Sequence, residues 1–184
     1  MLNVGGRAVG QAISQVRAAA AAARPGGRWV SAGRSGGAYW EHNAAPSSVG
    51  RAGRSANNEL GRLFNRSQRH RYDYNELYVA QPTGGYKILD SYNPRAGEIV
   101  SRKFTQLSEI EPKSAIGYLN EIVHKYKPGY VIANVPTSGE LPGRPLLGRM
   151  ILEVPIQTKP VPQSVLDAAA KRNILIRDVL RKVY

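Results

Sequence analysis

Three residues near the middle of the chain have the types and the spacing that metal-dependent cleavage of phosphate esters requires. Asp90 is followed, after ten intervening residues, by Ser101 and then by Lys103. A carboxylate can hold a hard divalent cation through oxygen, and a lysine beside it can orient the attacking water or neutralise developing negative charge. Ser101 supplies a neutral oxygen between the two. The pattern therefore predicts a hydrolytic site for phosphodiesters.

Two neighbouring strands are expected to bring these residues to one face of a sheet. Side chains two residues apart in a strand point to the same side, so Ser101 and Lys103 share a face. The turn NPRAG at residues 93–97 joins this segment to the one that carries Asp90. By the same alternation Glu98 faces away from Lys103 and is expected to be structural, although a β-bulge would reverse this.

Other interpretations of these residues remain open. An aspartate at a strand edge and a lysine on an exposed strand are common features without a catalytic role. A second possible active strand has the sequence Gln157-Thr158-Lys159, with Glu153 on the same face. Prolines flank that segment, and no aspartate precedes it at hairpin distance.

Hydrophobic periodicity predicts a mixed α/β domain around the candidate site. A helix that begins at Ser55 is followed by three strands with short turns, which form an antiparallel meander. The expected helices span residues 55–66, 114–127 and 162–172, and the expected strands span residues 74–82, 86–92, 98–107, 130–136, 149–157 and 174–180.

The chain before this domain has a different composition. Residues 1–54 are rich in Ala, Gly and Arg and are expected to form a linker or an N-terminal extension to a domain spanning residues 55–184. Alanine favours a helix over residues 5–23, whereas residues 34–54 are expected to form a loop. Trp29, Tyr39 and Trp40 could anchor the extension if it packs on the domain.

The charge of the chain predicts an anionic partner. The formal net charge is +13, and cysteine is absent, which excludes disulfides, thiolate metal sites and a cysteine nucleophile. No stretch approaches the roughly 20 apolar residues of a membrane-spanning helix, so no membrane segment is expected. A basic run interleaved with Tyr72 and Tyr74, together with one arginine of the third strand, is expected to track phosphates. These arginines are Arg62, Arg66, Arg69, Arg71 and Arg102.

The stretch ILDSYNPRAGEIVSRKFTQLSEI, residues 88–110, resembles the core motif of the PD-(D/E)xK nuclease superfamily. It is most similar to the nuclease toxin domains of bacterial polymorphic and contact-dependent inhibition toxins. The resemblance covers roughly residues 55–180. It implies a restriction-endonuclease-like fold in which the three-stranded antiparallel meander carries the active site. Ser101 departs from the wider superfamily, which has a carboxylate at this position.

The resemblance also implies an activity and a set of partners. It implies an endonuclease that uses Mg²⁺, Mn²⁺ or Zn²⁺, held by Asp90 and by Glu59, which occupies the place of a glutamate on the helix before the meander. The implied substrate is DNA, with transfer RNA or other RNA as the alternative. A delivered effector of this kind acts in the cytoplasm of the target cell, and its cognate immunity protein is expected to be acidic.

Two further alternatives follow from the residues themselves. Glu59 could simply interact with the positive end of its helix, and Glu76 is a rival acid that falls inside the first strand. The chain could also be a non-catalytic module that binds nucleic acid through its basic residues alone. Removal of metal by a chelator separates a nuclease from a binding module, since cleavage of nucleic acid would stop whereas binding would persist.

Overall fold

The computed structural model describes residues 28–31, 38–41 and 51–184, and for residues 28–31, 38–41 and 51–57 it describes the backbone alone. The chain divides into two units, Met1–Gln68 and Arg69–Tyr184. This division lies C-terminal to the expected linker boundary at residue 54. The predicted helix at residues 5–23 lies outside the described residues.

In the first unit, two short strands form an antiparallel pair and a long helix follows. Strand β1 (Arg28–Ser31) pairs with β2 (Ala38–Glu41), and Trp29 lies opposite Trp40. Helix α2 (Arg51–Gln68) begins before Ser55 and buries Leu60, Leu63 and Phe64. The predicted loop over residues 34–54 is therefore wrong over β2 and over the first turn of α2. In β2 the aromatic residues Tyr39 and Trp40 favour a strand.

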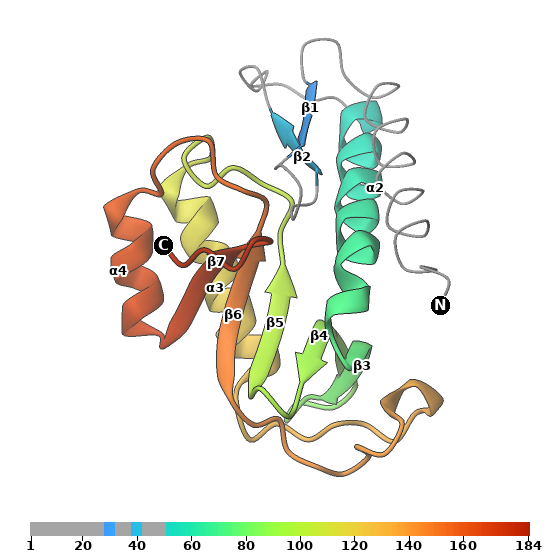
Figure 1. Cartoon of the computed structure of the whole chain (residues 1–184). Helices are drawn as coiled ribbons and strands as arrows, with labels where there is room; N and C mark the ends of the chain where they lie inside the picture. Colours follow the sequence, from blue (N-terminus) through green and yellow to red (C-terminus); the bar gives the residue numbers. More distant parts are fainter. Residues whose placement is uncertain (1–27, 32–37, 42–50) are drawn as a thin grey trace. The chain divides into compact units, whose positions relative to one another are not determined.

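The second unit is built on one mixed five-stranded sheet (Figure 1). Its strands lie in the order β3 (Tyr74–Ala80), β4 (Tyr86–Asn93), β5 (Glu98–Arg102), β6 (Arg149–Val154) and β7 (Ile174–Asp178). The first three are antiparallel and the last three are parallel. Helices α3 (Pro112–Tyr126) and α4 (Gln163–Lys171) make the two parallel connections. The predicted mixed α/β class and the three-stranded meander are confirmed.

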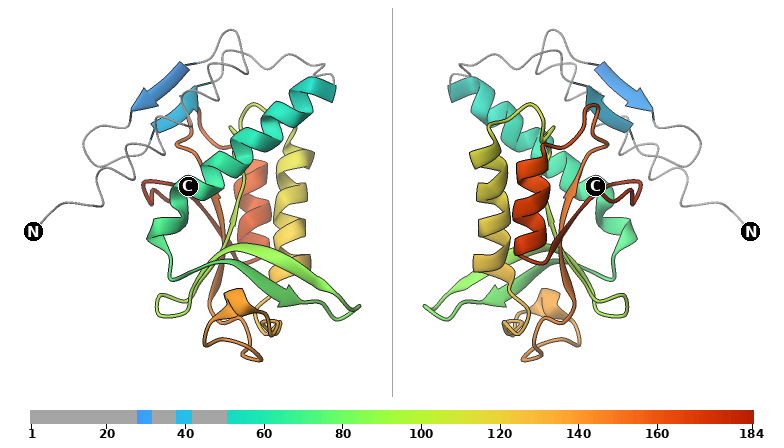
Figure 2. Two further views of the ribbon diagram at one scale, coloured as in Figure 1. Left: turned by 90° about the vertical axis from the view of Figure 1, so that its right-hand side faces the viewer. Right: turned by 90° about the vertical axis from the view of Figure 1, so that its left-hand side faces the viewer.

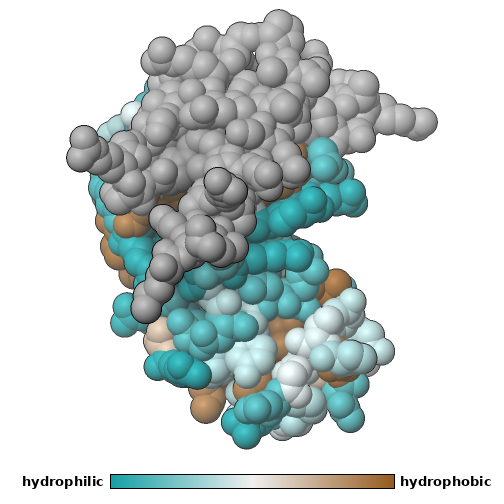
Figure 3. All heavy atoms as spheres, turned by 45° about the vertical axis from the view of Figure 1, so that its right-hand side comes forward, coloured by the Kyte–Doolittle hydropathy of each residue, from teal (hydrophilic) through white to brown (hydrophobic). Residues whose placement is uncertain are grey.

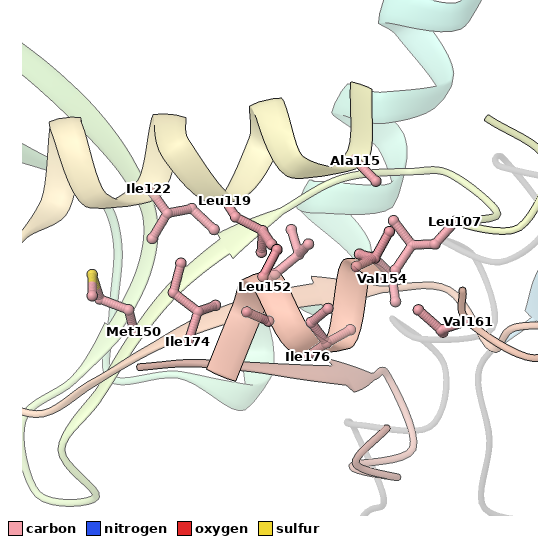
Figure 4. Packing of buried hydrophobic residues seen from close by; sticks show 13 residues of the cluster. Leu107, Ala115, Leu119, Ile122, Met150, Leu152, Val154, Val161, Ile174 and Ile176 are labelled. Carbon is pink, nitrogen blue, oxygen red and sulfur yellow. The ribbon is translucent and has the colours of Figure 1, made fainter. Parts of the chain in front are cut away.

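Both helices pack on the same face of the sheet, where they lie side by side (Figure 2). Alternate residues of β6 and β7 point into this layer and meet the apolar stripe of α3 (Figure 4). Fully burying a large aliphatic side chain contributes about 1.5–3 kcal/mol. The largest buried side chains here are Leu107, Leu119, Ile122, Leu152 and Ile176.

The opposite face of the sheet buries a network of charged side chains around Glu153. This carboxylate accepts hydrogen bonds from the Arg102 Nε at 2.8 Å and the Tyr72 hydroxyl at 2.5 Å. The Arg177 Nε lies 3.4 Å from it, and the Arg177 Nη1 lies 2.6 Å from Glu98. Because these residues come from β5, β6, β7 and the turn before β3, the network ties neighbouring parallel strands together.

Four predicted strands end early, two of them, at residues 74–82 and 174–180, by two residues only, and a fifth does not form. The predicted strand at residues 98–107 ends at Arg102, and the one at 149–157 ends at Val154, where Pro155 removes an amide donor. Residues 130–136 make only isolated bridges, from Val131 and Ile132, and the bridge from Ile132 goes to the outer edge of β3. The segment thus covers part of an edge strand that would otherwise expose its backbone.

The surface of the described residues in Figure 3 is mostly hydrophilic, with smaller apolar areas between. No helix in the part of the chain that the structure describes has the length and hydrophobicity needed to cross a bilayer.

One close backbone contact fixes the start of β6 against β5. Gly148 has φ of 120°, and a Cβ atom built on it would lie 2.1 Å from the carbonyl oxygen of Gly97. The Arg149 amide donates to that same carbonyl at 2.8 Å. Only glycine is compatible with both the conformation and the approach.

We therefore expect Gly148→Ala to lower the free energy of unfolding by about 1–3 kcal/mol, since the added carbon forces the backbone apart. Gly117→Ala is the matched control: Gly117 is in α3, and its added Cβ meets nothing within 4 Å. That change should stabilise the protein by up to about 1 kcal/mol through helix propensity. Urea unfolding measures both, and equal midpoints for the two variants would contradict the prediction.

Candidate active site

Asp90 and Ser101 meet at the point where β4 and β5 separate. The ladder between the strands ends at the pair Ser91 and Val100. At the next position the Asp90 Oδ2 accepts hydrogen bonds from the Ser101 hydroxyl at 3.3 Å and the Arg102 amide at 2.7 Å. The carboxylate thus binds a strand amide where the ladder stops. The expected sharing of one face by these two residues is confirmed.

Lys103 follows directly, just beyond the end of β5. Its amide donates to the Glu153 carbonyl at 3.1 Å, so the backbone still runs beside β6. Its ammonium group lies 2.9 Å from the Glu121 Oε2 and 5.1 Å from the centre of the Tyr118 ring. Both partners belong to α3. The helix therefore holds the lysine by an ion pair and a cation–π contact.

Glu121 is shared between two lysines. Its other oxygen lies 2.5 Å from the Lys125 Nζ, one helical turn further along α3. Burial alone would raise the pKa of Glu121, but the hydrogen bonds from Lys125 and Lys103 outweigh this and lower it. Glu121 is therefore an ionised carboxylate at neutral pH, well suited to position Lys103.

Tyr126 connects this helix to the strand that carries Asp90. Its hydroxyl donates to the backbone carbonyl of Ile88, two residues before Asp90. Burial raises the pKa of Tyr126, and the negative charges of Asp90 and Glu121 raise it further. The phenol therefore stays protonated and donates to the strand that carries Asp90.

The pKa of Asp90 is shifted in the opposite direction to that of Glu121. Burial raises the pKa of Asp90 above its ordinary value, although the Arg102 amide and the charges of Arg102 and Lys103 act in the opposite direction. The folded protein therefore disfavours the ionised form. A cation beside Asp90 would remove that penalty.

Two oxygen donors near Lys103 are of the type that a hard divalent cation prefers. They are the Asp90 carboxylate and the Ser101 hydroxyl, whereas both oxygens of Glu121 are bound to lysines. Within the described residues, no group of three or more His, Cys, Asp or Glu side chains could hold a metal ion. Oxygen donors suit Mg²⁺ or Mn²⁺ better than Zn²⁺, which is commonly bound by nitrogen or sulfur.

The other predicted acid, Glu59, lies exposed on α2 in the first unit. It pairs with Arg62 at 3.8 Å, and Arg66 is exposed on the same helix. Its role as a metal ligand stays a prediction, as does the role of these two arginines in binding phosphates.

The remaining basic residues have partners inside the second unit. Arg69 pairs with Glu76, and Arg71 lies 3.6 Å from Glu153. Arg102 is buried in the network of the opposite face, with its guanidinium 4.6 Å from the centre of the Tyr72 ring. These positions favour structural roles for Arg71 and Arg102 over the predicted contact with nucleic acid.

Glu76 has an unusual backbone conformation beside the site. It lies across from Asp90 in β3 but drops out of the ladder between the two strands, and its φ is 53°. The left-handed region costs a non-glycine residue about 1–2 kcal/mol. Strain of this kind persists where the surroundings impose it, and it often accompanies functional sites.

Two of the alternatives are resolved by position. Glu98 is buried and bound to Arg177, as expected for a structural residue. Gln157 lies beyond β6 in a loop, where its side chain bonds to the backbone of Thr105, Leu107 and Pro155. Gln157 therefore locks the loop after β5, and the second possible active strand does not form.

Sequence reasoning missed Glu121. The only signal was its spacing of four residues from Lys125 on a predicted helix, which is also typical of an exposed ion pair. The chain matches no protein-family model, no curated protein and no solved structure. The chemistry of the cluster is therefore inferred from its own geometry.

The raised pKa of Asp90 leads to a stability prediction. Stability from a carboxyl with a raised pKa is fully present below its unfolded value, near 3.8, and is lost as the pH rises through the folded value. Asp90→Asn keeps an oxygen that can accept both hydrogen bonds and removes the charge. Its free energy of unfolding at neutral pH should equal or exceed that of wild type, with the difference vanishing in acid.

Asp178→Asn is the matched control for urea unfolding at both pH values. The Asp178 carboxylate accepts from the Tyr184 hydroxyl at 2.9 Å and, through its other oxygen, from the Leu180 amide at 2.8 Å. An amide cannot accept at both positions, so this variant should be destabilised. A marked loss of stability in Asp90→Asn at neutral pH would contradict the prediction.

Proposed function

We propose that this chain is a metal-dependent nuclease toxin domain with a restriction-endonuclease-like fold, which hydrolyses phosphodiester bonds in DNA. The observation that supports this most is the hydrogen bond between Asp90 and Ser101 where β4 and β5 separate, with Lys103 following at the same strand end. The sequence order of helix, three antiparallel strands, helix and parallel strand agrees with the proposed fold.

In this mechanism Asp90 provides the carboxylate that holds a divalent cation, and waters would complete the coordination of that cation. The cation, when bound, would supply Lewis-acid stabilisation of the phosphate and a more acidic water. Ser101 fixes the orientation of the Asp90 carboxylate by its hydrogen bond. Lys103 orients the water or neutralises charge on the phosphate, and Glu121 holds its ammonium group in place.

The wider role is proposed from the resemblance and the charge. A net charge of +13 favours association with a polyanion, because bound counterions are released. Such an enzyme would be delivered into a competing cell, act in its cytoplasm and be neutralised in the producer by an acidic immunity protein. RNA is the alternative substrate.

Plasmid digestion tests the activity directly. Wild-type protein with Mg²⁺ or Mn²⁺ should nick or linearise the plasmid, and excess chelator should stop it. Asp90→Asn should lower the rate at least about a hundredfold, since loss of the metal ligand removes several kcal/mol of barrier stabilisation. Total RNA in a parallel reaction separates the two substrates. Cleavage at the wild-type rate by folded Asp90→Asn protein would remove this site from consideration.

Lys103 and Ser101 should differ in importance. Lys103→Ala removes a positive charge beside the developing negative charge and should be nearly inactive, whereas Ser101→Ala loses one neutral hydroxyl and should retain measurable activity. Lys159→Ala is the control, because Lys159 is an exposed lysine of the loop that rivalled this site in the sequence. Cleavage rates measured across a titration of each metal rank the activities of the three variants. An inactive Lys159→Ala with a fully active Lys103→Ala would reverse the assignment.

A further inference from the structure

The hairpin of β3 and β4 carries exposed apolar side chains that the proposed chemistry does not use. Tyr86 is 58% exposed and Ile88 is 48% exposed, both high for large hydrophobic residues. Tyr78 lies across from Ile88 and packs edge to face against Tyr86, with 5.7 Å between ring centroids. We call Tyr78, Tyr86 and Ile88 the hairpin strip. Contiguous exposed apolar residues commonly mark a binding surface.

Two residues of the hairpin strip lie on the strand that also carries Asp90. Tyr86, Ile88 and Asp90 are alternate residues of β4, and Tyr78 is the cross-strand partner of Ile88. At about 3.3 Å per residue, Ile88 lies roughly 7 Å from Asp90 along the strand and Tyr86 roughly 13 Å. A nucleic acid whose scissile phosphate lies beside Asp90 would therefore have neighbouring nucleotides within reach of the strip.

The charges beside the strip favour a polyanion over a neutral partner. The strip is attached to α3 through the bond from Tyr126 to the Ile88 carbonyl. Glu121 bridges Lys103 and Lys125 and so brings the two ammonium groups close together, with one positive charge in excess. Positive charge for a backbone and aromatic rings for bases are the two features of surfaces that bind single-stranded nucleic acid.

We propose that the hairpin strip stacks on unpaired bases of a single-stranded nucleic acid whose backbone runs to Asp90 and Lys103. This deepens the proposed function, on which it rests, by naming a single-stranded segment as the substrate. Bases within a duplex are already stacked on one another and cannot lie flat on such a surface. Any base has an aromatic face, so the strip carries no sequence preference of its own.

Binding measured without cleavage tests this. Fluorescence anisotropy of the full chain is followed with a labelled single-stranded oligonucleotide and with the same sequence as a duplex, both in excess chelator. Tyr86→Ala and Ile88→Ala should weaken single-strand binding by about five- to a hundredfold and affect the duplex less. Because no phosphate contact is lost, the salt dependence should keep its slope.

Two variants serve as controls. Tyr86→Phe keeps the ring and should bind as wild type, and Leu147→Ala removes an apolar side chain that is 61% exposed elsewhere and should also bind as wild type. Unchanged single-strand affinity in Tyr86→Ala would overturn the proposal. An equal loss for strand and duplex would overturn it as well.

The two proposals fail separately. If the single strand binds through Tyr86 but plasmid, RNA and the single-stranded oligonucleotide with metal are never cut, the nuclease function fails and the strip remains a nucleic-acid surface. If cleavage depends on Asp90 and metal while Tyr86→Ala binds and cuts as wild type, the nuclease function stands and the strip proposal fails.

Discussion

Glu153 is the charged group on which the geometry of the site depends. It is fully buried on the middle strand of the parallel part of the sheet and is surrounded by Tyr72, Arg102, Arg177 and Arg71. Burial alone would raise the pKa of Glu153, but the charges of Arg102 and Arg71 and the Tyr72 hydroxyl hold it below its ordinary value. The carboxylate is thus ionised throughout the neutral range, and it prevents the buried arginines from facing each other uncompensated.

The network reaches the site through one residue. The Arg102 side chain is bound to Glu153 on one face of β5, while the Arg102 amide donates to Asp90 and the neighbouring Ser101 hydroxyl does so on the other face. Strand alternation therefore directs the charged residues of the buried network to one face of β5 and the residues of the candidate site to the other. Glu98 and Arg102 hold parallel strands together, and Ser101 and Lys103 form the site with Asp90. This is why strands with apolar flanks carry so many charged residues.

Local rules predicted the parts of the site that depend on strand geometry. Alternation and a short turn were enough to bring Asp90 to Ser101, and helical periodicity was enough to define most of the buried face of α3. The contacts that the sequence did not predict are tertiary contacts between elements that are distant in the chain. The pairing of Lys103 with Glu121 joins a strand end to a helix, and no spacing in the sequence encodes it. Arg71 and Arg102 read as surface cations because their partner, Glu153, is distant in the chain and comes from the strand beside β5. Residues 130–136 have strand-forming residues but find only an outer edge to pair with.

The two carboxylates near Lys103, those of Asp90 and Glu121, have different roles in the proposed site. Lys103 and Lys125 already compensate Glu121, so adding a cation there gains little, and its use is to keep Lys103 in place. Asp90 is held in a position where its negative charge is costly, and that cost is recovered only when a positive charge arrives. Proteins store such local instability where they act. Strand β4 carries both the Asp90 carboxylate and two residues of the hairpin strip, and the bond from Tyr126 to the Ile88 carbonyl attaches this strand to α3. A bound base and a bound cation would therefore both be positioned by β4.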